Sequence, residues 1–381
     1  MPSYFNLNYM AFSVEKSDLV RLRSAEMRDA DELAQVFSFL NSPHAAPDNV
    51  KGIIGATQES LARDGGMTHL TIVAETLDPI SLDPKHIVAG GSLVRMSGGD
   101  SAPLLYRIED DRSMNLFTYD QPTLEFGGMV AHPDARSLGI GMAISAVRAL
   151  IARYFNHLFD ADAVLSDFMP PLNDIDTKEN VFWDDLIVNC LQLNGNLDAV
   201  KDMVSKLTGT KVTTNTQLSA AIGNILSDDD RNRMVNRYWP QLIDSSLVSD
   251  DVLNITRNVN GPTEKARDNL LAIYGGSMSR IGAFPINGGP NYVAKATDGP
   301  TAAEGVLGLS YIPASDRSVV FNPFSEGLTK PATPNDLRDF TAYWTPASVK
   351  DGRVSVSNSV AFVLGRLYND PVYSYTPPRK V

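Results

Sequence analysis

Arg136, Gly139 and Gly141 have the residue types and the spacing of a phosphate-binding turn. Glycine has no Cβ, so the backbone at such positions can approach a ligand closely. The N–H groups in the first turn of a helix carry partial positive charge and bind phosphate, and an arginine adds charge-assisted hydrogen bonds. We therefore expect a phosphate or diphosphate to bind the segment made of Arg136, Ser137, Leu138, Gly139, Ile140, Gly141 and Met142.

The elements around this segment are predicted to be a strand and a helix. The run TLEFGGMV is largely apolar and predicts a strand, and Pro133 ends it because proline has no N–H to donate. A helix follows, because apolar residues recur at helical spacing at Ile144, Val147, Leu150, Ile151 and Phe155. An ordinary strand–turn–helix unit with packing glycines is the alternative, since a dinucleotide fold would have a third glycine where Ile144 stands.

The whole phrase, Arg-x-x-Gly-x-Gly after a strand that ends in Val-x-His-Pro, resembles the acyl-CoA motif of the GNAT N-acetyltransferase superfamily. The resemblance implies an α/β fold with a GNAT-like mixed, mostly antiparallel sheet flanked by helices. It also implies acyl-CoA, as acetyl-CoA or succinyl-CoA, as the co-substrate. In that superfamily the motif strand splays from its neighbour, its amides pair with the pantetheine arm, and the turn holds the diphosphate. Met129 and Val130 are the strand residues that this resemblance assigns to acyl-CoA.

From Val20 to Asp298 the order of parts resembles one branch, the arginine N-succinyltransferase family. The matching pieces are the opening VRLRSAEMRDADELAQV, the hairpin TIVAETLDPISLDPKHIVAGGSL, the motif segment, Phe182-Trp183, Thr263-x-x-Ala266-Arg267 and Gly288-Gly289-Pro290. The family's proton-transferring histidine falls at Asn260, and its acids before Gly-Gly-Pro are absent here. An amide can orient a substrate but cannot act as an acid or base, so the resemblance implies an altered acceptor.

N-acyl transfer needs a base for the protonated amine and donors for the tetrahedral oxyanion. The N–H of Met129 or Val130 is the candidate oxyanion donor. Glu125 and Asp167 are the candidate bases, each on a predicted strand, and Asn260 is a candidate for orienting the acceptor. An outward-facing strand acid is an equally good interpretation of Glu125, and a cap for the turn before Pro170 is a better one for Asp167.

Two regions are expected. Residues 18–298 form the acyl-CoA-binding domain, with a helical insertion at about 190–275, where four segments show helical spacing. Residues 299–381 form a small β-rich region, with short β segments at Val306–Ile312, Ser318–Phe321, Val354–Val356 and Ser359–Leu367.

The composition of the chain indicates which classes of binding partner and which cellular compartment to expect. The 381-residue chain has a net charge of −12, which argues against nucleic acid or an anionic membrane as the main partner. No apolar run of about 18 residues and no signal peptide is found. The single cysteine, Cys190, excludes an intramolecular disulfide, and we expect a cytoplasmic protein. No metal is expected, because Asp228-Asp229-Asp230 lacks the spacing of a calcium loop.

Three functions stay open from the sequence. The first is an N-acyltransferase acting on a small-molecule amine or amino acid. The second is a non-catalytic CoA-binding member, for example the partner subunit of a homo- or hetero-oligomer, since the family includes paired subunits. The third is a binding module unrelated to CoA.

Overall fold

The computed structural model places the chain in two units, each built from segments that are distant in the sequence. Residues 1–93, 128–158 and 300–381 belong to unit 1, and residues 94–127 and 159–299 belong to unit 2. The structure describes residues 19–39, 46–63, 66–78, 80–98, 104–108, 114–168, 172–174, 179–180, 188–193, 195–224, 259, 261–283, 290–310, 317–322, 333–365 and 370–378.

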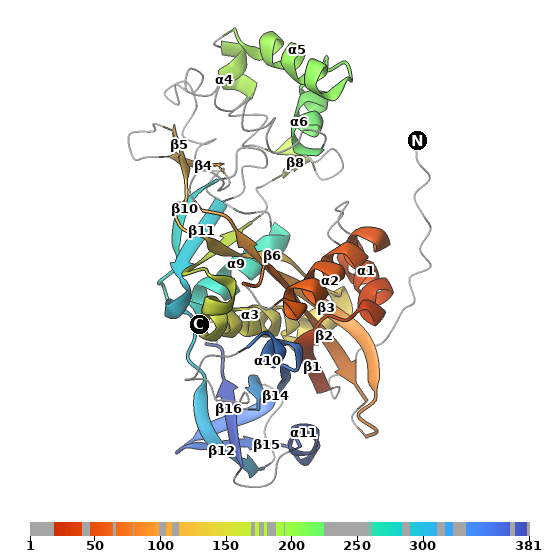
Figure 1. Cartoon of the computed structure of the whole chain (residues 1–381), viewed down its shortest axis with the longest axis vertical. Coiled ribbons are helices and arrows are strands. Elements are labelled where there is room, and N and C mark those ends of the chain that lie inside the picture. Colours follow the sequence, from red (N-terminus) through yellow and green to blue (C-terminus); the bar gives the residue numbers. More distant parts are fainter. Residues whose placement is uncertain are drawn as a thin grey trace. The chain divides into compact units, whose positions relative to one another are not determined.

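Unit 1 contains the end of the motif strand β6 and the strands of the C-terminal region. Figure 1 shows these strands. Its strands follow the order β13-β16-β12-β15-β14-β1-β2-β3-β6, and β3 and β6 each continue into unit 2. Their bounds are β1 Leu19–Ser24, β2 His69–Leu77, β3 Pro84–Met96, β6 Thr123–Ala131, β12 Ala303–Leu309, β13 Arg317–Phe321, β14 Thr341–Lys350, β15 Arg353–Val356 and β16 Pro371–Tyr375. The helices are η1 Met27–Asp29, α1 Ala30–Ser38, α2 Pro47–Ala62, η4 Pro133–Leu138, α3 Ile140–Phe159, α10 Pro334–Arg338 and α11 Asn358–Val363.

Two successive glycines let helices approach both faces of β3. A Cβ on Gly90 would lie 2.6 Å from Cδ1 of Leu33 in α1, and one on Gly91 would lie 3.0 Å from Cγ2 of Ile144 in α3. Successive strand residues point to opposite faces of a sheet, so α1 and α3 pack on opposite sides of β3. A side chain at either position would push a helix away from the sheet.

A cluster of four side chains ties β1 to β2 and to the start of α1. Arg23 pairs with Asp29 through two nitrogens, at 2.7 and 2.8 Å, and its Nε donates to Glu75. Arg21 lies directly opposite Glu75 in the register and pairs with it at 2.8 Å. Arg23, Asp29 and Glu75 are each less than 10% exposed. Burial alone would raise the pKa of Glu75, but the hydrogen bonds from Arg23 and Arg21 hold it below its usual range.

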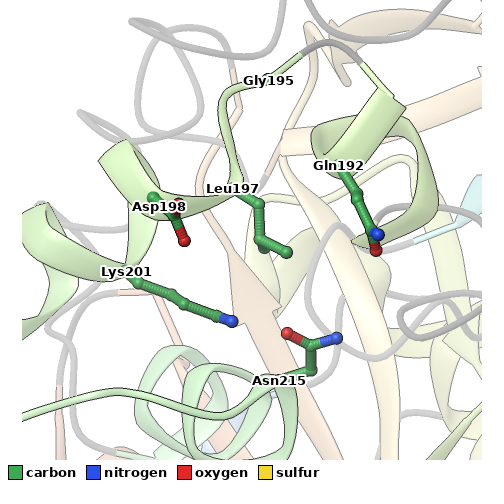
Figure 2. A pocket seen from close by; sticks show the side chains of 6 residues that line it. All are labelled: Gln192, Gly195, Leu197, Asp198, Lys201 and Asn215. Atoms are coloured by element: carbon green, nitrogen blue, oxygen red, sulfur yellow. The ribbon is translucent and has the colours of Figure 1, made fainter.

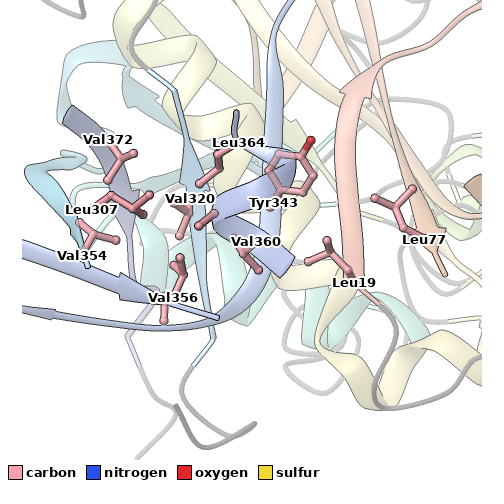
Figure 3. Close-up of a cluster of buried hydrophobic side chains, with 12 residues drawn as sticks. Leu19, Leu77, Leu307, Val320, Tyr343, Val354, Val356, Val360, Leu364 and Val372 are labelled. Carbon is pink, nitrogen blue, oxygen red and sulfur yellow. The ribbon is translucent and has the colours of Figure 1, made fainter. Parts of the chain in front are cut away.

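The C-terminal strands join the N-terminal ones in the sheet of unit 1. β14 pairs antiparallel with β1, with Val20 opposite Trp344, and also with β13. Figure 3 shows the apolar cluster that results: Leu19 and Leu77 from β1 and β2 lie with side chains from β12, β13, β14, β15, β16 and α11. Pattern analysis did identify this region as β-rich, but it gave no indication of the pairing with β1.

One element in this region differs from expectation. The β segment predicted at Ser359–Leu367 is wrong for its first half, because Asn358–Val363 is the helix α11. Val360, Ala361 and Leu364 are buried in the apolar cluster, whereas Phe362 is 76% exposed. Burial at these spacings fits one face of a helix, which a short apolar run does not distinguish from a strand.

Unit 2 contains the remaining strands and the helices of the insertion. Its strands follow the order β6-β7-β11-β10-β4-β5, with β6 and β7 parallel and the other pairs antiparallel, and β8 pairs with β9. The bounds are β4 Leu104–Ile108, β5 Met114–Thr118, β7 Ala163–Asp167, β8 Leu172–Asp174, β9 Glu179–Asn180, β10 Ser279–Ala283 and β11 Pro290–Lys295. The helices are α4 Val188–Leu193, α5 Leu197–Thr208, α6 Asn215–Asn224, α9 Gly261–Ile273 and η8 Ala296–Asp298. The mixed, mostly antiparallel sheet flanked by helices confirms the predicted fold class.

Candidate functional site

The segment that follows β6 forms a short 3₁₀ helix capped by a histidine. Nδ1 of His132 accepts a hydrogen bond from the N–H of Asp134 at 3.3 Å, and Pro133 occupies the first helical position. Burial lowers the pKa of His132, Asp134 opposes this shift, and Arg136 adds to it. A neutral imidazole that accepts from the backbone is a capping group.

Gly139 joins this 3₁₀ helix to α3 in the left-handed conformation, with φ of +71°. Only glycine adopts this conformation at little cost. The N–H of Gly139 donates to the Arg136 carbonyl at 3.2 Å, and the N–H of Ala143 donates to the Gly139 carbonyl at 3.1 Å. The first turn of an α-helix leaves its leading N–H groups without an intrahelical acceptor, which here are those of Ile140, Gly141 and Met142.

The surroundings of Gly141 are open. The nearest atom to a Cβ built there is Cε of Met129, at 4.0 Å, and Sδ of Met129 accepts from Oγ of Ser145 at 3.1 Å. The end of β6 and the start of α3 thus lie together, as the motif predicts. Gly128, just before Met129, has φ of +53°, so the regular alternation of β6 is interrupted there.

The remaining residues of the turn are either buried or exposed to solvent. Leu138 and Ile140 are buried and anchor the turn, whereas Arg136 and Ser137 are exposed. Nε of Arg136 donates to the Ala131 carbonyl at 3.3 Å, which fixes the guanidinium beside the end of β6. Its terminal nitrogens make no hydrogen bond within the part of the chain that the structure describes, so they can serve an anion.

Trp344, which the sequence did not single out, also contacts this turn. Its Nε1 donates to the Leu138 carbonyl at 2.7 Å. No local pattern around a residue so far along the chain could have indicated this contact, because it depends on the pairing of β14 with β1.

The two candidate bases lie in unit 2, on the neighbouring parallel strands β6 and β7. Thr123, Leu124 and Glu125 pair with Ala163, Val164 and Leu165, and the register of the two strands ends at Glu125 and Leu165. Asp167 ends β7 and lies opposite Asn291 of β11. Burial raises the pKa of Glu125, with no charged group among the causes. Asn260 lies outside the described residues, so its role stays a prediction.

A separate pocket of about 380 Å³ lies among α4, α5 and α6 in unit 2. Figure 2 shows the side chains of Lys201 and Asn215 directed toward each other, with Asp198 and Leu197 beside them and Gln192 on the facing helix. None of the residues predicted from the sequence lines this pocket. We therefore take the turn in unit 1 as the candidate phosphate-binding site, and we consider the two strand acids of unit 2 separately.

Metal ligands and membrane-spanning helices are considered next, in the described residues alone. Within them, no group of three or more histidine, cysteine, aspartate or glutamate side chains is arranged to hold a metal ion. Within the same residues, no helix combines the length and the apolar character that crossing a membrane requires.

Comparison with solved structures relates the fold to known acyltransferases. The structure of arginine/ornithine succinyltransferase subunit AI from Pseudomonas aeruginosa matches with a TM-score of 0.59 and 16% sequence identity, over 95% of this chain and 100% of that one. Glucosamine-6-phosphate N-acetyltransferase from Arabidopsis thaliana matches 33% of this chain and 68% of its own, with 12% identity and a TM-score of 0.20. A chimeric spermidine N-acetyltransferase from Vibrio cholerae matches 39% and 70%, with 12% identity and a TM-score of 0.23.

The sequence itself has no such match: no family model and no curated protein matches it. The likeness to the succinyltransferase subunit therefore shows a shared fold at low identity. It confirms the predicted GNAT-like fold class.

Proposed function

We propose that this chain, with its arginine N-succinyltransferase-like fold, is an acyl-CoA-dependent N-acyltransferase that acts on a small amine or amino acid. The observation that carries the proposal is the turn between β6 and α3. There the exposed Arg136 and the left-handed Gly139 precede a helix of 20 residues, and Gly141 in the first turn of that helix has open surroundings. This combination supports binding of the CoA diphosphate, and we expect acetyl-CoA or succinyl-CoA as the donor.

The roles that we propose follow the chemistry of thioester aminolysis. The amine attacks the thioester carbonyl, the thiolate of CoA leaves, and the amine gives up a proton. The N–H of Met129 or Val130 would stabilise the oxyanion. Glu125 is the first candidate for the base, since its raised pKa lies nearer to neutrality than that of an exposed carboxyl. Asp167 is the second, and Asn260 would orient the acceptor.

The acceptor that we propose is not arginine. A guanidinium binds best to carboxylates in a bidentate pair, and this sequence has Asn287 and apolar residues where the family has acids before Gly-Gly-Pro. The histidine of the family is also replaced, by Asn260. These two replacements support a different amine as the acceptor. We expect the reaction to take place in the cytoplasm.

The second candidate function is a CoA-binding subunit without catalysis. The loss of the family's histidine favours it, and the turn from Arg136 to Gly141 is common to both functions. A thermal-shift titration with CoA followed by a thiol-release assay on a panel of amines distinguishes them. Binding without turnover supports the subunit, and turnover supports the enzyme.

Gly141→Glu tests the CoA site directly. An acid near a helix N-terminus is compatible with the fold and with the helix dipole, and a side chain at this position meets only Met129. Two like charges about 4 Å apart repel by roughly 4 kcal/mol at an effective dielectric constant of 20. We therefore expect CoA affinity, measured by calorimetry, to fall at least about tenfold while the melting temperature is kept.

Gly52→Glu is the matched control. Gly52 is an exposed glycine in α2, with no atom within 4 Å of its Cβ position, and the variant has the same change in net charge. Its CoA affinity should equal that of the wild type. Equal CoA affinity in the two variants would contradict the proposed site, and a wild type that binds no CoA would contradict the proposed function.

A further inference from the structure

Trp344 holds the turn from the C-terminal side of unit 1. It lies on β14, opposite Val20 of β1, and is 5% exposed. Its indole N–H donates to the Leu138 carbonyl at 2.7 Å, and Cζ2 of its ring lies 3.4 Å from the position of a Cβ on Gly139. The indole therefore contacts the last residue of η4 and the left-handed glycine that follows.

The hydrogen bonds of the Leu138–Gly139 peptide show what this contact does. At one edge of this peptide group the Leu138 carbonyl accepts a hydrogen bond from Trp344. At the opposite edge the N–H of Gly139 donates to the Arg136 carbonyl at 3.2 Å. A peptide group is planar, so fixing both ends fixes the orientation of the plane. That orientation sets the φ of Gly139, and with it the direction in which α3 presents its leading N–H groups.

We infer that Trp344 is a positioning residue for the diphosphate of CoA. It holds the turn in its binding conformation before the ligand arrives, so the C-terminal region contributes to the CoA site without touching the ligand. This inference rests on the proposed function. When only a fraction of the protein is in the conformation that binds, the apparent affinity is the intrinsic affinity multiplied by that fraction. Releasing the turn therefore weakens CoA binding without removing a ligand contact.

Trp344→Phe removes the N–H and keeps an aromatic ring. The variant leaves the buried Leu138 carbonyl without its donor, which is equivalent to a roughly 5- to 150-fold change in the equilibrium between the held and the released turn. We expect the dissociation constant of CoA, measured by calorimetry on the full chain, to rise by roughly that factor. The number of CoA molecules bound per chain should not change.

Tyr343→Phe is the matched control on the same strand. The hydroxyl of Tyr343 donates to the Val363 carbonyl at 3.3 Å, and its ring belongs to the apolar cluster on the other face of β14. The hydroxyl also hydrogen-bonds with the side chain of Arg21, so the variant removes the bonds to these two partners but none from the turn. Its CoA affinity should equal that of the wild type, even where both variants lose thermal stability.

A spectroscopic measurement keeps the test independent of the stability of any Trp344 variant. The chain has three tryptophans, so Trp183→Phe with Trp239→Phe leaves Trp344 as the only one. The indole is already buried and hydrogen-bonded to Leu138 before CoA is added, so its emission should change little when CoA binds.

The outcomes separate the two proposals. Equal CoA affinity in the wild type and in Trp344→Phe overturns the positioning role alone. A large change in Trp344 emission on addition of CoA does the same, because it would show that the turn is not held beforehand. No binding of CoA by the wild type overturns the positioning role and the proposed function together.

Discussion

Glu125 is the residue on which the proposed chemistry depends most. It lies on the motif strand, and burial raises its pKa without help from a charged neighbour. A general base works in its ionised form, so the rate should fall as the pH falls through this raised pKa. The position on β6 was predictable from the motif, but the shift was not, because it depends on how strands and helices far apart in the sequence surround the carboxyl.

We predict that Glu125→Gln lowers the rate of acyl transfer by about 10²–10⁴ and removes the acidic limb of the pH–rate profile. Asp167→Asn should have the larger effect if the second carboxyl is the base. Glu304→Gln, at an exposed position of β12, is the control and should leave the rate unchanged. Rates equal to the wild type in both Glu125→Gln and Asp167→Asn would remove these two acids from the mechanism.

His69 makes the stability of unit 1 depend on pH. Its ring nitrogen contacts Oγ1 of Thr71 at 3.1 Å, and burial lowers its pKa to about 4. Between the usual pKa of about 6.5 and this value, the unfolded chain binds a proton that the folded chain does not. The free energy of unfolding should therefore decrease as the pH falls through this window.

The prediction is tested with His69→Gln, which keeps a polar group and removes the titration. Denaturant unfolding at pH 7 and pH 5 should show a smaller decrease for this variant than for the wild type. His157→Gln, at an exposed position of α3, should behave as the wild type does. An identical decrease in the wild type and in His69→Gln would show that other groups cause the dependence.

At the scale of elements, the ion pairs around Arg23 hold β1, β2 and the start of α1 together. We predict that Glu75→Gln lowers the free energy of unfolding by about 3–5 kcal/mol at pH 7, because Arg23 is then left buried with one partner fewer. The exposed pair of Arg28 and Glu26 supplies the control, since Glu26→Gln should cost less than about 1 kcal/mol.

The same pairs contribute an acid-sensitive part of the stability. The pKa of Glu75 is lowered in the folded state, so its contribution is complete above the unfolded value of about 4.3 and is lost as the pH falls through the folded value. The difference between the wild type and Glu75→Gln should therefore narrow below about pH 4. A difference that is constant from pH 7 to pH 3 would contradict this account.

The sequence predicted elements well where the local pattern was sufficient. The motif strand, the turn and α3 follow from glycines, Pro133 and apolar spacing within one short stretch. β14 was not predicted, since Pro346 interrupts its pattern and its strand conformation depends on pairing with β1 and β13. The helix α11 was taken for a strand because its apolar run is too short to show a period.

At the scale of the whole molecule, the fold resembles that of arginine/ornithine succinyltransferase subunit AI, and our proposal is that the acceptor is a different amine. We predict that the purified wild type gives no measurable release of thiol from succinyl-CoA with arginine. A different primary amine from the same panel should give release if the chain is an enzyme. Robust succinylation of arginine would contradict the altered acceptor and leave the acyl-CoA site intact.

One part of the candidate site could be predicted from the sequence, and another part could not. The residues from Met129 to Met142 are consecutive, and their local conformation follows from their own types. The support from Trp344 and the burial of Glu125 depend on contacts between segments that lie far apart along the chain. Such contacts leave no local pattern, so only the folded structure reveals them.

The pairing of β1 with β14 has a consequence for synthesis on the ribosome. β1 is synthesised long before its partner on one edge, Thr341–Lys350. Throughout elongation the nascent chain therefore exposes an unpaired strand edge, which is a template for association with other chains. The pairing of β1 with β14 forms only after Thr341–Lys350 has been synthesised, and until then a chaperone that covers the edge of Leu19–Ser24 would protect the chain from aggregation.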